Sequence, residues 1–380
     1  MRFNWAAFLI FNVVVAGAAV AAQTNAPEPS NKTGANVLVV AEGLRSPWGM
    51  QFLPDGRVIV TERPGNIRII SRDGTISEPI SGAPKAWARG QGGMLDIALA
   101  PDFETSRQVF ISFAQERGAK GGATSVVRAT LVDEPDRERL TDTRVIFEQE
   151  PASGGGRHFG SRLAFGGDGN LFVTLGDRGQ RSLAQDLDGH IGKIVRIRPD
   201  GKVPSENPFV GRPGVQEEIW SFGHRNPQAA AIHPQTGALW TIEHGARGGD
   251  EINIPQAGRN YGWPVITYGR DYSGAKIGIG TRKDGMEQPI YYWDPSIAPS
   301  GMAFYADERF PEWSGNLFVG ALRDRHLSRL ILDDDRVVAE EKLLESLGER
   351  IRDVRQGPDG FLYVLTDSSN GQLLRLAPAQ

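Results

Sequence analysis

A histidine in a glycine-rich segment is the first residue whose type and setting could do chemistry. Residues 154–163 read Gly-Gly-Gly-Arg-His-Phe-Gly-Ser-Arg-Leu, which places three glycines before Arg157 and His158. Glycines let a backbone pass close to a ligand, and an imidazole can act as a general base near neutral pH. His158 is therefore a candidate base, although a single histidine among glycines is also typical of a packed or surface residue.

Two pairs of residues could bind polar or anionic groups. Arg225 and Asn226 stand side by side before a proline, which suits fixed contacts to carbonyl or carboxylate oxygens. Arg350 and Arg352 would share one face of a strand and form an anion site if that face lined a cavity. A structural turn and a solvated charged face remain the respective alternatives.

Residues 243–253 (Glu-His-Gly-Ala-Arg-Gly-Gly-Asp-Glu-Ile-Asn) combine a glycine-rich turn with carboxylates. Such a turn exposes backbone carbonyls, and together with carboxylates these are the oxygen ligands that Ca²⁺ prefers. The spacing is not that of an EF-hand, so an acidic loop capped by its own side chains is the alternative.

The elements that must position these residues are predicted from an internal repeat. A Pro/Asp/Gly-type turn followed by a short β-branched and aromatic run recurs six times, at residues 54–61, 101–112, 167–174, 234–241, 314–319 and 358–365. Each copy predicts a strand entered through a tight turn. Copies 45 to 80 residues apart, roughly, suit one four-stranded antiparallel blade each. We therefore expect an all-β, six-bladed β-propeller over residues 36–380, with ligand sites where loops meet over the central channel.

One other structural interpretation is open. A pair of β-sandwiches would also be all-β, but that fold gives no reason for the same turn-and-strand sequence to recur six times. The best helical pattern is short and lies at residues 340–347.

Composition excludes several classes of function. The 380 residues contain no cysteine, which excludes disulfides, thiolate metal sites and a cysteine nucleophile. The net charge of −4 argues against a nucleic-acid partner. The GxSxG, Walker A and HExxH motifs are absent, and no GxGxxG motif joins a strand to a helix.

The N-terminus predicts export. Residues 1–22 resemble a signal peptide, with Arg2, an apolar run over 5–16 and small residues at 19–21, and residues 23–35 form a polar sequence expected to be a flexible tether. An uncleaved membrane anchor is the alternative, but the run is short and Asn12 interrupts it. We expect no stable membrane insertion after cleavage.

Taken in order, with residues 90–96 (Gly-Gln-Gly-Gly-Met-Leu-Asp) before them, these segments resemble a known family. They are similar to the soluble pyrroloquinoline-quinone (PQQ) dependent sugar dehydrogenases, the glucose/sorbosone dehydrogenase family, and most closely to its aldose sugar dehydrogenase branch. The resemblance extends over residues 43–367. It implies a six-bladed propeller, in agreement with the repeat count.

The resemblance implies a role for each matching position. His158 falls at the general base, and Arg225 at the donor that polarises the quinone carbonyl together with Ca²⁺. The positions implied to contact PQQ are Gln91, His158, Arg225, Asn226, Tyr272, Arg323, Arg350 and Arg352. The implied metal ligands are the backbone carbonyls of Gly245 and Ala246 for the Ca²⁺ beside PQQ, and Glu251 and Tyr261 for a second, structural Ca²⁺.

The implied activity is oxidation of an aldose at C1 to a lactone by hydride transfer to PQQ, in the bacterial periplasm or outside the cell. The electrons would pass to an external acceptor. Arg157 stands where the glucose-oxidising branch has an acidic residue, which weakens the case for glucose. Ala246 replaces a proline and leaves its loop less constrained.

Two other classes of function are compatible with the same propeller fold. A Ca²⁺-dependent hydrolase of lactonase type would not need the arginines at 225, 323, 350 and 352. A non-catalytic propeller that binds carbohydrate or protein would not need a base at 158. The sequence determines neither the sugar, nor the acceptor, nor whether the protein is a monomer or a homodimer.

Overall fold

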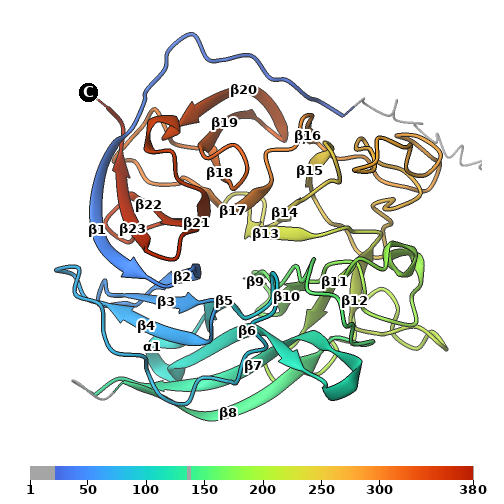
Figure 1. The fold of residues 1–380 in the computed structure, drawn as a ribbon, viewed down its shortest axis with the longest axis horizontal. Helices are drawn as coiled ribbons and strands as arrows, with labels where there is room; N and C mark the ends of the chain where they lie inside the picture. The colour runs from blue at the N-terminus through green and yellow to red at the C-terminus, as the bar shows by residue number, and fades with distance from the viewer. Residues whose placement is uncertain (1–21, 135–137, 380) are drawn as a thin grey trace, which may run out of the picture.

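The computed structural model describes residues 22–134 and 138–379, and its strands form six sheets arranged in a ring (Figure 1). We number the sheets as blades 1 to 6. Blade 1 comprises β2 (Pro47–Phe52), β3 (Val58–Glu62) and β4 (Asn66–Ile70). Blade 2 comprises β5 (Met94–Leu99), β6 (Gln108–Glu116), β7 (Gly122–Val132) and β8 (Arg139–Glu148). Blade 3 comprises β9 (Leu163–Phe165), β10 (Leu171–Thr174), β11 (Lys193–Ile197) and β12 (Ile219–Phe222).

The second half of the ring is built in the same way. Blade 4 comprises β13 (Pro227–Ile232), β14 (Leu239–Glu243), β15 (Asp250–Asn253) and β16 (Tyr291–Trp293). Blade 5 comprises β17 (Pro299–Phe304), β18 (Leu317–Ala321), β19 (Leu327–Asp333) and β20 (Arg336–Leu343). Blade 6 comprises β21 (Ile351–Gln356), β22 (Leu362–Thr366), β23 (Gly371–Ala377) and the N-terminal strand β1 (Asn36–Leu44). The short helices are α1 (Phe103–Ser106), η1 (Gly118–Lys120), η2 (Arg181–Gln185) and η3 (Glu345–Leu347).

All neighbouring strands within a blade are antiparallel, so the predicted six-bladed β-propeller is confirmed. Blade 1 has three strands, and an isolated bridge between Ile70 and Ile76 stands in place of its fourth. The best helical pattern of the sequence, at residues 340–347, forms no α-helix; the chain there is the end of β20 followed by η3. Buried and more exposed side chains alternate along β20. A segment this short has too few residues to distinguish the two-residue period of a strand from the roughly 3.6-residue period of a helix.

The repeated phrase forms the same hairpin in every blade. Each copy supplies the turn into the second strand, namely β3, β6, β10, β14, β18 and β22. The first strands β2, β5, β9, β13, β17 and β21 contact one another in turn and form the inner ring. Because strands alternate in direction, these turns lie at one end of the ring. The links between blades, and between second and third strands, lie at the other end.

The ring is closed by pairing the two ends of the chain. β1 pairs antiparallel with β23, with Val37 opposite Leu376 and Leu44 opposite Gly371. Figure 1 shows β1 as the outer strand beside the C-terminal blade. Residues 23–35, which precede β1, form no helix and no named strand, and Thr33 donates its backbone N–H to Glu341 on blade 5 (2.9 Å).

Apolar side chains fill the space between adjacent blades. One buried cluster lies between each pair of neighbours; Leu171 of blade 3 packs with Phe110 of blade 2, and Trp240 of blade 4 packs with Leu317 of blade 5. Burying each such side chain contributes roughly 1.5–3 kcal/mol. The sheets face one another, and the loops at the ends are left free to form a site.

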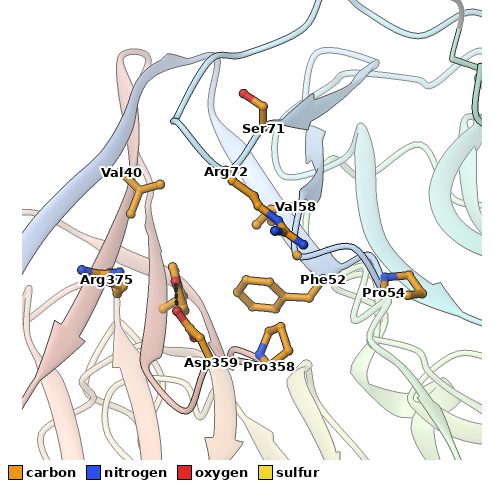
Figure 2. Close-up of a pocket in the computed structure, with 11 residues that line it drawn as sticks. Val40, Phe52, Pro54, Val58, Ser71, Arg72, Pro358, Asp359 and Arg375 are labelled. Carbon is orange, nitrogen blue, oxygen red and sulfur yellow. Dashed lines mark hydrogen bonds between the residues drawn. The ribbon is translucent and has the colours of Figure 1, made fainter. Parts of the chain in front are cut away.

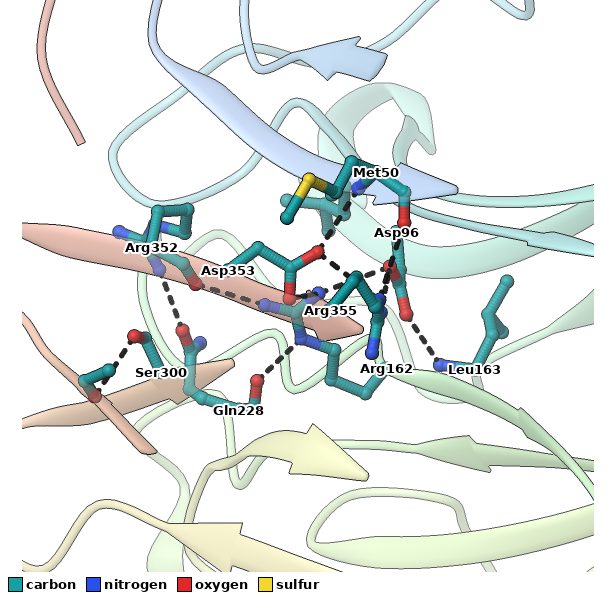
Figure 3. Close-up of polar contacts among 12 residues, drawn as sticks. Met50, Asp96, Arg162, Leu163, Gln228, Ser300, Arg352, Asp353 and Arg355 are labelled. Atoms are coloured by element: carbon teal, nitrogen blue, oxygen red, sulfur yellow. Dashed lines mark hydrogen bonds and ion pairs between the residues drawn. The ribbon is translucent and has the colours of Figure 1, made fainter. Parts of the chain in front are cut away.

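A buried ion-pair network lies in the centre of the ring (Figure 3). Arg162, of which 1% is exposed, contacts Asp96 at 3.1 Å and Asp353 at 3.0 Å. Arg355 lies 3.5 Å from both carboxylates, so two cations balance two anions. Arg162 also donates to the carbonyl of Arg352 (3.1 Å). The network therefore connects the centre of the ring to a residue predicted to bind an anion.

Candidate functional site

The predicted site residues gather at the end of the ring opposite the repeated turns. They occupy links between blades, links between second and third strands, or strand ends beside those links. The exception is the long connection between β15 and β16, which carries two of them. In chain order they are Gln91, His158, Arg225, Asn226, Gly245, Ala246, Glu251, Tyr261, Tyr272, Arg323, Arg350 and Arg352.

His158 is paired with a carboxylate that the sequence analysis did not single out. Its Nδ1 lies 2.6 Å from Oδ1 of Asp177, which is 1% exposed and lies on the link between β10 and β11. A carboxylate accepts, so Nδ1 carries the hydrogen and Nε2 is left as the basic nitrogen. No described residue hydrogen-bonds to Nε2. The pair has the arrangement of an oriented general base.

Asp177 is itself fixed by two donors. Trp263 Nε1 donates to Oδ2 (2.8 Å) and the backbone N–H of Gly179 donates to Oδ1 (2.7 Å). Burial alone would raise the pKa of Asp177, but the bonds from His158 and Gly179 and the charge of Arg225 outweigh it and lower that pKa. Asp177 therefore stays ionised and holds the imidazole in one tautomer.

The backbone of His158 is held in an uncommon conformation. Its φ is 54°, in the left-handed region, which costs a non-glycine residue about 1–2 kcal/mol. Its N–H donates to Oε1 of Gln91 (2.7 Å). Burial lowers the pKa of the His158 imidazole; Asp177 opposes this shift, and the charges of Arg225 and Arg157 reinforce it. His158 is therefore neutral at pH 7 and able to accept a proton.

Arg225 and Asn226 are buried with polar atoms left without partners. The exposed fractions are 6% and 0%, and Arg225 Nε and Asn226 Nδ2 have no hydrogen-bond partner among the described residues. Glu243 accepts from the backbone N–H of Arg225 (2.5 Å), and Arg225 Nη1 donates to the carbonyl of His244 (3.1 Å). Leaving a buried donor unpaired costs about 1–3 kcal/mol, so these atoms point to a ligand.

Arg350 and Arg352 share one carboxylate. Both guanidinium groups contact Oδ2 of Asp367, at 2.7 and 3.1 Å. Arg352 is 8% exposed, also donates to Gln228 Oε1 (3.0 Å), and has an unpartnered Nε. Burial lowers the pKa of Arg352, and Asp367 opposes that shift. Because two guanidinium groups share a single carboxylate, this side of the site carries a net positive charge.

Three cavities meet at His244. One of about 770 Å³ has Gly245, Ala246, Tyr272 and Arg323 among its lining residues. A second of about 340 Å³ has Gln91, Arg350 and Arg352 in its lining, and a third, very small one has Arg225, Glu251 and Tyr261. His244 lines all three. Ten of the twelve predicted residues therefore line cavities that share His244, whereas His158 and Asn226 are in the lining of none of the three.

Tyr272 and Arg323 lie at the rim of this region. Tyr272 is 71% exposed, and the Arg323 side chain is 58% exposed while donating to the carbonyl of Ser296 (2.6 Å). The structure therefore brings these two residues to the larger cavity but does not pack them against His158.

The turn at Gly245 and Ala246 is crowded by carbonyl oxygens. A Cβ at Gly245 would lie 2.2 Å from the carbonyl oxygen of Gly248 and 2.3 Å from that of Gly249, so only glycine fits. Asp250 fixes the turn by accepting from the N–H of Gly245 (2.7 Å). Backbone oxygens concentrated in one turn are suitable ligands for a hard cation.

Behind this turn lies an acidic pair, of which Glu243 is buried and Glu251 is partly buried. Asn253 Nδ2 contacts Glu243 Oε1 at 3.2 Å and Glu251 Oε2 at 3.4 Å, whereas Asn253 Oδ1 has no partner among the described residues. Burial and the facing charge of Glu243 raise the pKa of Glu251 well above its ordinary value. Tyr261 borders the same space, and its hydroxyl donates to the carbonyl of Ile254 (2.7 Å).

A further cavity lies away from this site. A pocket of about 410 Å³ lies between blades 1 and 6. Phe52, Arg72, Asp359 and Arg375 are among its lining residues (Figure 2). It borders two of the repeated turns and contains none of the predicted residues. Its position at the opposite end separates it from the region around His244.

Sequence reasoning missed the residues that orient the predicted ones. Asp177, Trp263, Asp367 and His244 received no role, because each acts through a contact between segments far apart in the chain. Asp177 had one local signal, the Gly-Asp-Arg-Gly turn directly after the third copy of the repeat.

Within residues 22–134 and 138–379, no three His, Asp or Glu side chains gather as a metal site. The same residues contain no helix with the length and hydropathy of a membrane span. The predicted signal peptide, apart from Ala22, lies outside the described residues.

The fold and the site together define a six-bladed propeller in which a carboxylate orients a histidine near a cluster of arginines. The family model described as "Glucose / Sorbosone dehydrogenase" matches residues 44–375. Because this match covers most of the chain, the protein belongs to the glucose/sorbosone dehydrogenase family.

Relatives with known names and structures agree with this assignment. The chain is 48% identical over 346 residues to the aldose sugar dehydrogenase YliI of Escherichia coli (strain K12), covering 90% of this chain and 93% of that protein. The apo-form structure of the soluble E. coli aldose sugar dehydrogenase superposes with a TM-score of 0.88 at 48% identity, covering 91% and 100% of the two chains. A PQQ-bound aldose sugar dehydrogenase from Streptomyces coelicolor gives a TM-score of 0.74 at 29% identity, covering 91% and 99%.

Proposed function

We propose that this protein is an exported quinoprotein that oxidises aldose sugars at C1 to lactones, with PQQ and Ca²⁺ as cofactors. One observation carries the proposal: Asp177 orients the imidazole of His158, and Gln91, which accepts from the backbone N–H of His158, lines a cavity together with Arg350 and Arg352. Arg225, Asn226 and Arg352 each carry a buried donor without a partner among the described residues. The family assignment and the PQQ-bound relative support it.

The residues present fit the chemistry of PQQ, which carries three carboxylates and several carbonyls. Arg350 and Arg352 would pair with carboxylates, as arginine forks do. Asn226 Nδ2 and Arg225 Nε are buried donors that would gain acceptors. The remaining contacts are proposed for Gln91, His158, Tyr272 and Arg323.

Calcium would take two places in this proposal. The carbonyls of Gly245 and Ala246 would bind the ion beside PQQ, because their turn already concentrates backbone oxygens. Glu251 and Tyr261 would hold a second, structural ion, which would offset the repulsion between Glu251 and Glu243 and give Asn253 Oδ1 a partner.

In the proposed mechanism His158 accepts the proton of the anomeric hydroxyl at Nε2. Asp177 keeps Nδ1 protonated and stabilises the imidazolium that forms. Arg225, fixed through its backbone by Glu243, presents a charged donor toward developing negative charge. Bound PQQ with its Ca²⁺ would supply the hydride acceptor for C1, and an external acceptor would then receive the electrons.

Localisation is part of the proposal. We infer that residues 1–22 direct export to the bacterial periplasm or beyond, and that residues 36–380 form the catalytic propeller. The proposed partners are an aldose as substrate and a separate, external electron acceptor. The protein itself is either a monomer or a homodimer.

The test is dye reduction by the purified protein with a panel of aldoses. We expect reduction that needs PQQ and Ca²⁺ together and that falls away when either is left out. PQQ binding without any reduction of the dye would overturn the proposed dehydrogenase activity. Metal-dependent lactone hydrolysis without PQQ would favour the lactonase-type alternative, and the absence of both activities would favour a binding propeller.

A further inference from the structure

A buried arginine beside Asp177 contacts the backbone that carries His158. Arg178 is 2% exposed, and no described carboxylate lies within ion-pair distance of its guanidinium. Burial lowers the pKa of Arg178 to about 10, with Asp177 opposing the shift, so it remains charged at neutral pH. A buried charge without an ion pair is costly and needs an explanation.

The two terminal nitrogens of the guanidinium donate to backbone carbonyls, whereas its Nε has no partner among the described residues. Arg178 Nη1 donates to Arg157 (2.8 Å), and Nη2 donates to Gly155 (2.6 Å) and Gly122 (3.2 Å), with Ser153 at 3.5 Å. Three of these four carbonyls belong to the segment that precedes His158. A single planar cation therefore joins that segment to the start of β7.

The same guanidinium lies over an aromatic ring. Its central carbon is 3.4 Å from the ring centroid of Phe159, which is 1% exposed and packs with Trp48 and Leu95. Arg178 thus contacts the residue before His158 and the residue after it. Its neighbour Asp177 holds the imidazole between them.

We infer that Arg178 is a positioning residue for the proposed base: it fixes the left-handed backbone of His158 so that Nε2 faces the site. The inference rests on the proposed function for its catalytic consequence but not for its geometry. The left-handed conformation is strained and persists only where its surroundings determine it. Arg178 supplies contacts on both sides of the strained residue.

The test is Arg178→Met, which keeps the length and removes the donors and the charge. In the apo protein we would record the downfield proton resonance of the His158 Nδ1–H bond to Asp177, assigned by its loss in His158→Gln. We expect this resonance to broaden or move upfield. The corresponding proton of the His224–Glu243 pair (2.9 Å) should stay in place as an internal control.

Kinetics provide the second readout. In the PQQ-loaded protein, Arg178→Met should lower kcat about 10- to 100-fold and leave KM for sugar within about threefold, because misplacing a base slows chemistry without removing binding contacts. The matched control is Arg196→Met, since Arg196 is also buried and stacks on an aromatic ring, at 5.1 Å from Trp220. It should lower stability and leave both readouts unchanged.

Unchanged His158 resonance and kcat in a folded Arg178→Met protein would overturn the inference. If that variant does not fold, Arg178→Lys decides, because it retains the charge but donates from one nitrogen; wild-type values for both readouts would again overturn the inference. If the wild type oxidises no sugar, the proposed function fails, but the apo resonance still tests the positioning.

Discussion

At the residue scale, the site depends on one imidazole whose surroundings determine its state. Asp177 selects the tautomer, Gln91 holds the backbone N–H, and burial keeps the ring neutral. Sequence reasoning could propose His158 as a base from its glycine-rich setting. It could not supply Asp177, because the partner of a side chain is determined by the folding of separate segments.

His158→Gln tests the proposed base directly. The amide cannot accept a proton from the sugar, so kcat should fall about 10²-fold or more. PQQ binding, measured by quenching of tryptophan fluorescence, should change little because the arginine donors remain. Turnover like that of the wild type would contradict the role.

Asp177→Asn should also lower kcat by about 10²-fold or more, because an amide cannot accept from His158, Trp263 and Gly179 as the carboxylate does. Stopped-flow measurement of the reductive step would show the loss in chemistry. Full activity would mean that the imidazole is oriented by other contacts.

The pH profile follows from the lowered pKa of His158. Because the neutral imidazole is the active form in the proposed mechanism, activity should rise as pH increases through that pKa. Burial, reinforced by the charges of Arg225 and Arg157, lowers it, so the midpoint of the rising limb of kcat/KM should lie below the ordinary histidine value of about 6.5. A midpoint above that value would contradict the described environment.

At the scale of elements, the strands set the fold and the links between them form the site. The repeated turn could be recognised in the sequence because its six copies share the same local composition. Its turns lie at the end opposite the site, so the repeat identifies the architecture but not the chemistry. The three-stranded blade 1 and the true state of residues 340–347 were not readable, because both depend on pairing with neighbouring strands.

Strand β1 gives a prediction at this scale. Deleting residues 22–44 would leave β23 without its outer partner and expose Leu373, which packs against Ala41 and Leu44. We expect the melting temperature to fall by more than about 10 °C, since roughly 1 kcal/mol corresponds to a few degrees in a protein of this size. Calorimetry showing a shift of only a few degrees would contradict closure by β1.

At the scale of the whole molecule, the centre of the ring connects the blades to one another and to the site. Arg162 contacts carboxylates from blades 2 and 6, and carbonyls of Gln228 and Arg352. Sequence composition offered no sign of this network, because its charges come from strands far apart in the chain.

Arg162→Met should destabilise the protein by about 3–5 kcal/mol, because Asp96 and Asp353 would lose a buried cation. Urea unfolding would measure the change. Arg336→Met is the control, because Arg336 pairs with Asp333 on the exposed surface and should cost at most about 1 kcal/mol. Equal effects of the two variants would contradict a stabilising central network.

The central claim is that the mouth of this propeller binds PQQ with Ca²⁺ and uses it to oxidise sugar. The most direct measurement is the absorption spectrum of the anaerobic protein with one equivalent of PQQ and excess CaCl₂, before and after an aldose is added. We predict a protein-bound quinone spectrum that bleaches or shifts on adding sugar, and no such change in His158→Gln on the same timescale. A spectrum that remains that of free PQQ, unaffected by protein and sugar, would contradict the account.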